Sequence, residues 1–126
     1  MKDIETQLKQ ELHIYHMRPE DLAHFDQADE DISEKVLTIQ LEWACYGQNI
    51  TGILLGRKYI SEIPRIWLIS NMMHVIEKDF DYRDEWNYRR LVELIVEIIP
   101  ELQNDVLSLN EKSTNPDIIE VINDFR

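Results

Sequence analysis

Cysteine, glycine and proline are scarce in this chain of 126 residues, which has one cysteine, three glycines and four prolines. A single cysteine cannot form a disulfide within the chain, so we expect a reducing compartment. The few glycines and prolines leave little material for the tight turns that join short strands. Alternating apolar and polar strand patterns are absent as well. The sequence therefore predicts an all-α protein.

Long hydrophobic runs are absent too. Apolar runs such as those from Trp43 to Tyr46 and from Ile66 to Ile69 fall far below the roughly 20 residues that a helix needs to cross a bilayer. The first residues are polar and lack the apolar core of a secretion signal. We therefore expect a cytoplasmic protein with no membrane partner.

Basic residues are few: 13 lysines and arginines stand against 25 acidic residues, a formal net charge of -12. Such a surface repels a polyanion, and the adjacent cations Arg57-Lys58 and Arg89-Arg90 are too few to form a basic patch. We expect no nucleic-acid partner. A basic protein partner is electrostatically favoured, although many acidic surfaces serve solubility alone.

Apolar residues at helical spacing predict a single all-helical domain over residues 1–126. The expected arrangement is an irregular multi-helix bundle or stacked helical hairpins, and no repeat of fixed period indicates a solenoid. The predicted helices cover residues 3–16, a short segment after Pro19, 32–47, 50–62, 65–78, 84–99, 101–109 and the residues after Asn115.

The helix over 84–99 has the broadest apolar surface and is expected to be central, with Asp81 or Asp84 as its N-cap. It also carries Trp86, Arg89 and Arg90. Because consecutive residues lie about 100° apart on a helix, we expect one arginine to be structural, held by carboxylates of adjacent helices. Helical geometry leans toward Arg90, and Trp86 is expected to be largely buried nearby.

Two of the three glycines, Gly52 and Gly56, are four residues apart within a predicted helix. Each lowers helix propensity by about 1 kcal/mol relative to alanine. Their shared face predicts close approach of another helix.

The densest uncompensated charge lies between Glu20 and Glu34, where no lysine or arginine intervenes. One interpretation is a solvated loop in which Asp31 or Ser33 caps the next helix. The other is a contact surface for lysines or arginines of a partner. The candidate partner-binding residues are Glu20, Asp21, Asp26, Asp29, Glu30, Asp31 and Glu34.

No established catalytic motif is present, so we expect no enzymatic activity, no cofactor and no metal. Cys45, inside an apolar helix, is interpreted as a small core residue, and His74 as a core or boundary residue. The rival hypothesis is a metal-dependent hydrolase. Its candidate ligands are His13, His16, Asp21 and His24, whose spacing is permissive but matches no known metal motif.

The second half of the chain resembles small all-α bacterial immunity-type proteins of toxin–immunity loci. The resemblance covers about residues 56–125. It rests on Gly56-Arg57, Ile63-Pro64-Arg65-x-Trp67, the segment from Asp84 to Leu94, Asn115-Pro-Asp-Ile118 with Glu120, and Asp124-Phe125. Asn87 stands where this pattern has an acid.

The resemblance implies a helical immunity protein and transfers no catalytic residue. Together with the charge, it leads to the expectation of a protein that binds and occludes a basic toxin domain, such as a nuclease. A helical adaptor or interaction subunit unrelated to toxins has every other sequence feature in common with it and stays the alternative.

Overall fold

The computed structural model describes residues 3–126, within which seven α-helices and two 3-10 helices follow one another and no strand occurs. The all-α prediction is confirmed for this part of the chain. The elements are α1 (Ile4–Ile14), the 3-10 helix η1 (Pro19–Gln27), α2 (Glu30–Cys45), α3 (Ile50–Ser61), α4 (Arg65–Asp79), α5 (Glu85–Ile98), the 3-10 helix η2 (Pro100–Leu102), α6 (Gln103–Ser108) and α7 (Pro116–Phe125).

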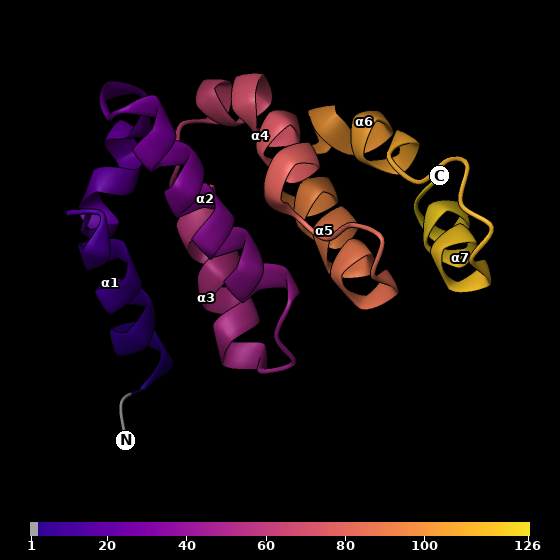
Figure 1. The fold of residues 1–126 in the computed structure, drawn as a ribbon, viewed down its shortest axis with the longest axis horizontal. Coiled ribbons are helices and arrows are strands. Elements are labelled where there is room, and N and C mark those ends of the chain that lie inside the picture. The colour runs from indigo at the N-terminus through magenta and orange to yellow at the C-terminus, as the bar shows by residue number, and fades with distance from the viewer. Residues whose placement is uncertain (1–2) are drawn as a thin grey trace.

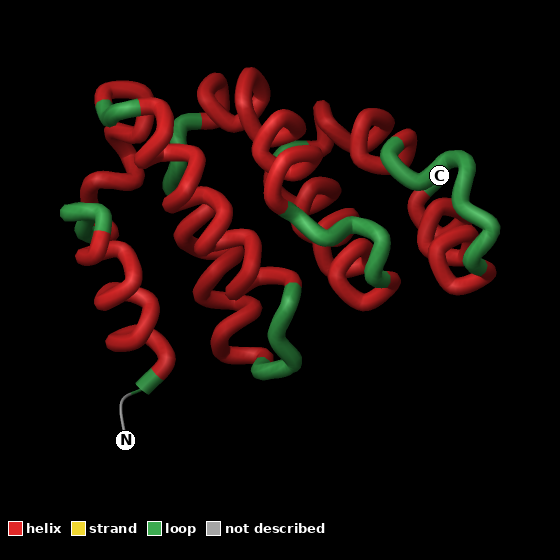
Figure 2. The backbone as a smooth tube through the Cα atoms, viewed as in Figure 1, coloured by secondary structure: helices red, strands yellow, loops and turns green. Residues whose placement is uncertain are grey.

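The helices form a row in which α1 stands at one end and α7 at the other (Figure 1). In this view α2 lies in front of α3, and α4 lies in front of α5, with loops at the helix ends (Figure 2). Helix α2 packs against α3, α4 and α5, while α5 packs against α2, α6 and α7. Two central helices therefore join the halves of the row, and one hydrophobic core cluster extends from Leu8 to Ile122.

Short polar side chains cap the N-terminal ends of several helices. Asp84 Oδ1 accepts the Asn87 N–H at 3.0 Å, so Asp84, and not Asp81, caps α5. Helix α2 is capped by Asp29, whose Oδ1 accepts the Ile32 N–H at 3.2 Å. The prediction of Asp31 or Ser33 as the cap is wrong, because α2 begins earlier and the Ser33 hydroxyl instead donates to the carbonyl of Phe25.

Close approach at the α2–α3 contact depends on glycine, as the spacing predicted. A Cβ atom added to Gly56 would lie 2.7 Å from the backbone nitrogen of Ala44, and one added to Gly52 would lie 3.1 Å from the Trp43 ring. Side chains at these positions would push the helices apart. The two glycines therefore set the distance between α2 and α3.

One polar side chain of α2 is buried without a partner. Gln40 is fully buried, and neither its Nε2 nor its Oε1 has a hydrogen-bond partner among residues 3–126. A buried amide without partners costs about 1–3 kcal/mol of desolvation. We therefore expect Gln40→Met, which keeps the shape, to raise the free energy of unfolding by about 1–2 kcal/mol in urea denaturation.

Gln103 is the matched control for that substitution, because its Nε2 donates to the carbonyl of Phe125 at 2.6 Å. Gln103→Met should lower stability, since it removes a hydrogen bond that is made. Equal effects of the two substitutions would contradict the assignment of a penalty to Gln40.

Candidate functional site

The acidic segment, residues 20–34, spans η1 and the start of α2, and its carboxylates differ in what they contact. Glu20, Asp26, Glu30 and Asp31 are exposed. Asp29 caps α2, and Asp21 accepts the backbone N–H of Arg18 at 2.9 Å. Only part of the segment is therefore free to meet a partner.

Glu34, unlike the exposed carboxylates of the acidic segment, is enclosed. It is 7% exposed, and its Oε1 lies 3.1 Å from Nε2 of His74 on α4. Glu34 lies about one helical turn beyond Glu30 and Asp31 and faces α4, so it is much less accessible than they are, and its role as a contact residue stays a prediction. His74 in turn is exposed, and its interpretation as a core or boundary histidine is wrong.

A cavity of about 550 Å³ opens beside the acidic segment, over the first half of α4. Pro64, Ile66 and Trp67 line it, and Asp26 of the acidic segment belongs to the same wall. Ile66 is 80% exposed, so its apolar side chain is accessible to a partner at this cavity. We call this cavity the α4 pocket.

Trp67 connects the α4 pocket to the acidic segment. Its ring meets that of Phe25 edge to face, with centroids 4.9 Å apart, and Phe25 is a buried residue of η1. Arg65, also in the pocket wall, has its charge engaged by Glu101, whose Oε2 accepts from Arg65 Nε at 2.8 Å. The acidic segment therefore adjoins the α4 pocket through Asp26 in its wall and through the Phe25–Trp67 contact beneath it.

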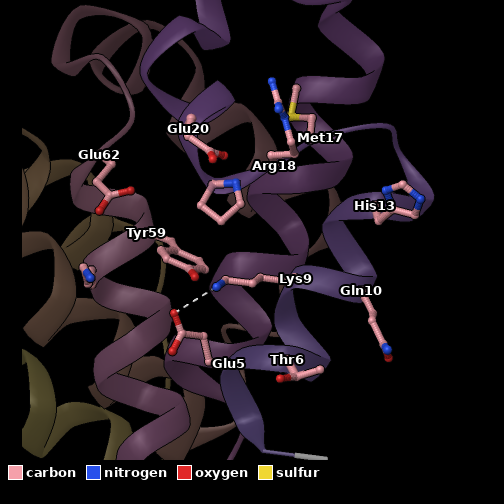
Figure 3. A pocket seen from close by; sticks show the side chains of 12 residues that line it. Glu5, Thr6, Lys9, Gln10, His13, Met17, Arg18, Glu20, Tyr59 and Glu62 are labelled. Atoms are coloured by element: carbon pink, nitrogen blue, oxygen red, sulfur yellow. Dashed lines mark ion pairs between the residues drawn. The ribbon is translucent and has the colours of Figure 1, made fainter.

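Another cavity, of about 640 Å³, lies between α1, the start of η1 and α3 (Figure 3). Its lining mixes both signs of charge: Lys9, Arg18 and Lys58 face Glu5, Glu20 and Glu62. Lys9 Nζ lies 3.3 Å from Glu5 Oε1, and this contact raises the pKa of Lys9. The balance of signs gives this cavity no preference for a charged partner.

The four candidate metal ligands do not form one site. His13 lines the cavity between α1 and α3, whereas His16, Asp21 and His24 line another between the end of α1 and η1. His16 adopts a left-handed backbone conformation with φ of 59°, which ends α1 and redirects the chain. Within residues 3–126 no group of three histidine, cysteine or acidic side chains is placed to hold a metal ion.

Cys45 is fully buried, as the sequence predicted for a core residue. Burial raises the pKa of its thiol to about 12, although Arg57 and Arg90 nearby act in the opposite direction. Since the thiolate is the nucleophile, Cys45 is not poised for nucleophilic chemistry near neutral pH.

The two arginines of α5 contact different carboxylates. Arg89 Nη2 lies 2.9 Å from Asp124 Oδ2 on α7, whereas Arg90 Nη1 lies 2.7 Å from Glu93 Oε1 on its own helix. Arg90 is the more buried of the two. The lean toward Arg90 as the more buried arginine is therefore confirmed, whereas the carboxylate from an adjacent helix contacts Arg89 and not Arg90.

Trp86 is 39% exposed, and its prediction as largely buried is wrong. The guanidinium of Arg90 lies 4.3 Å from the Trp86 ring centre, and the indole N–H donates to the Gly47 carbonyl at 3.3 Å. Trp86 stands in the first turn of α5, where the Gly47 carbonyl of the α2–α3 turn and Arg90 contact it.

Sequence reasoning missed the most buried arginine of this network, Arg57 on α3. Its side chain is 17% exposed and contacts Glu93 at 3.1 Å and Glu97 at 3.3 Å, both on α5. The Gly56-Arg57 pair was visible in the sequence. Its partners, however, are 36 and 40 residues away, and no local spacing indicates them.

Comparison with known proteins assigns no family: no family model matches the chain, and no curated protein and no solved structure matches it either. Among residues 3–126, no helix combines the length and the apolar character that crossing a membrane requires.

Proposed function

We propose that this chain is a cytoplasmic immunity-type protein that binds a cognate basic toxin domain, a nuclease being the favoured kind, and occludes its active surface. One observation supports the proposal above all: Asp26 of the acidic segment lies in the wall of the α4 pocket, together with the exposed apolar side chain of Ile66. Protein interfaces commonly have an apolar centre that supplies binding energy and a polar rim that excludes water.

Charge supports a basic partner in particular. The net charge of -12 attracts cations at long range. Asp26 lies in the wall of the α4 pocket, while Glu30 and Asp31 are further exposed carboxylates of the acidic segment. A nuclease binds phosphates through lysines and arginines. Carboxylates of an immunity protein placed on those cations would exclude the nucleic acid, while an apolar side chain in the α4 pocket would slow dissociation.

The resemblance over residues 56–125 separates this proposal from a helical adaptor with the same surface. It includes Ile63-Pro64-Arg65-x-Trp67, which contributes Pro64, Arg65 and Trp67 to the α4 pocket. A helical adaptor unrelated to toxins remains the second candidate, and the experiment below distinguishes the two.

Co-expression with the protein encoded in the neighbouring gene tests the function directly. If the proposal is right, that neighbour is toxic alone, and this chain restores growth and co-purifies with the neighbour. Death of the cells with and without this chain would overturn the immunity role. A stable complex with a harmless neighbour would favour the adaptor.

The acidic segment makes a kinetic prediction for that complex. Glu30→Lys with Asp31→Lys should slow association by about tenfold at low salt, because steering by exposed charges acts mainly on the association rate. The difference should shrink toward physiological salt, where screening acts over about 8 Å. Stopped-flow measurements over a salt series would record both effects.

Two design choices make the comparison fair. Asp29 stays in place, because reversing it would remove the cap of α2 and confuse stability with binding. The control is Glu111→Lys with Glu120→Lys, two exposed acids outside the acidic segment with the same change in net charge. Equal slowing by both pairs would mean that net charge alone, and not this surface, steers association.

A further inference from the structure

A separate cavity of about 290 Å³ opens where α1, the end of α2 and the start of α3 meet. Its wall contains two carboxylates from different helices, Glu11 and Glu42, and two aromatic side chains, Trp43 and Tyr46. None of these residues belongs to the acidic segment or to the α4 pocket. We call it the Glu11–Glu42 pocket.

The Trp43 ring in this pocket is held from two sides. Its indole N–H donates to Glu11 Oε2 at 2.6 Å, a short contact with a charged acceptor. On α3, a Cβ atom added to Gly52 would lie 3.1 Å from ring atom Cε3, so the ring lies directly on the helix backbone. An aromatic surface fixed in this way loses little freedom when a ligand binds to it.

The carboxylates of the pocket lack a counter-ion. Glu42 has no cation within ion-pair distance among residues 3–126. Partial burial, with the nearby carboxylates of Glu11 and Asp79, raises the pKa of Glu42. The C-terminal end of α2 and the N-terminal end of α3 meet here, and their opposite dipoles offset each other. The two carboxylates therefore decide the sign of charge that the pocket accepts.

The same chain already holds a guanidinium with this combination of groups. Arg90 lies 4.3 Å from the Trp86 ring centre while its Nη1 contacts both carboxylate oxygens of Glu93, at 2.7 and 2.9 Å. The Glu11–Glu42 pocket presents an indole and carboxylates without the arginine. A planar guanidinium can lie against an aromatic ring and bond a carboxylate at once, which a lysine ammonium does less well.

We propose that the Glu11–Glu42 pocket binds an arginine side chain presented by another protein. Its volume far exceeds the roughly 30 Å³ that a water molecule occupies and suits a larger cation. The proposal does not depend on the toxin assignment, because it follows from this pocket alone and names a side chain, whatever protein carries it.

The test uses N-acetyl-arginine amide as the probe and the indole N–H signals of the three tryptophans, recorded by NMR. The Trp43 signal, assigned from Trp43→Phe or from nuclear Overhauser contacts to neighbouring protons, should shift and saturate, while those of Trp67 and Trp86 stay in place. N-acetyl-lysine amide should bind severalfold more weakly. Glu42→Gln should weaken arginine binding by about tenfold, the size of one charge-assisted hydrogen bond.

Glu120→Gln is the matched control, since it removes the same charge from an exposed carboxylate on α7, outside both the pocket and the acidic segment. It should leave the affinity unchanged. Glu11→Gln keeps an acceptor for the Trp43 N–H, so weaker binding with an unmoved Trp43 signal would report the lost charge and not a displaced ring. Circular dichroism confirms that each variant is folded.

Three results would overturn the proposal. One is a linear shift of all three indole signals without saturation. Another is equal affinity for the arginine and lysine probes, which would make the pocket a general cation site. The third is equal weakening by Glu42→Gln and Glu120→Gln, which would reduce the effect to net charge.

Discussion

Gly56→Ala should destabilise the protein by about 2 kcal/mol or more, and it should lower the thermal midpoint by about 10 °C. The new Cβ would lie 2.7 Å from the backbone nitrogen of Ala44 and 3.1 Å from its Cα. Backbone cannot rotate away as a side chain can, so α2 and α3 must separate. Alanine improves helix propensity by about 1 kcal/mol, which offsets only part of that strain.

Two other glycines serve as controls for this substitution. In Gly47→Ala the nearest atom to the new Cβ is 4.0 Å away, so thermal unfolding should change little. In Gly52→Ala the obstacle is the Trp43 ring, a side chain that can shift, and the loss should be smaller than at Gly56. Similar midpoints for all three variants would mean that α2 and α3 are not held at the distance described.

Glu93→Ala should destabilise the protein by about 2 kcal/mol, because one carboxylate serves two arginines. Glu93 contacts Arg57 at 3.1 Å and Arg90 at 2.7 Å. Its removal leaves the guanidinium groups of Arg57 and Arg90 mostly buried and close together, without the carboxylate that both contact. Loss of one partner of a fully buried pair costs about 3–5 kcal/mol and loss of an exposed one under about 1, and Glu93, partly exposed, lies between these limits.

Glu97→Ala provides the comparison for Glu93→Ala in urea denaturation. Glu97 contacts only Arg57, at 3.3 Å, and its side chain is mostly exposed, so its loss should cost under about 1 kcal/mol. Arg57→Met should be at least as damaging as Arg90→Met, since Arg57 is the more buried and links α3 to α5. An equal cost for Glu93→Ala and Glu97→Ala would contradict the role of Glu93 as the shared partner.

The contact of Arg57 on α3 with Glu93 on α5 could not be predicted from local spacing in the sequence. Helical spacing brings Arg90 beside Glu93, which is a relation within one helix. Helical spacing does not place Arg57 beside Glu93, because that contact depends on how α3 and α5 each pack against α2. Likewise Arg89 meets Asp124 only because α7 folds back onto α5.

The acidic segment divides for a similar reason. Seven carboxylates look equivalent in the sequence, yet Asp29 caps α2, Asp21 bonds the backbone of Arg18, and Glu34 is enclosed against α4. Which contact each carboxylate makes depends on the residue at which a helix begins or on the position of a neighbouring helix. The α4 pocket was not predicted at all, since Asp26 and Ile66 are far apart in the chain and come together in one pocket wall only in the folded structure.

The sequence by itself determined the helical class, the approximate extent of most helices, the close approach at Gly52 and Gly56, and the burial of Cys45. These follow from periodicity, from capping and from the absence of a side chain, which act within a few residues. Only the tertiary structure decided which carboxylates stay open, where Trp86 and Arg57 lie, and which cavities adjoin charged groups. Those features arise where separate helices meet. Contacts between residues that are far apart in the sequence produce no periodic pattern from which they could be predicted.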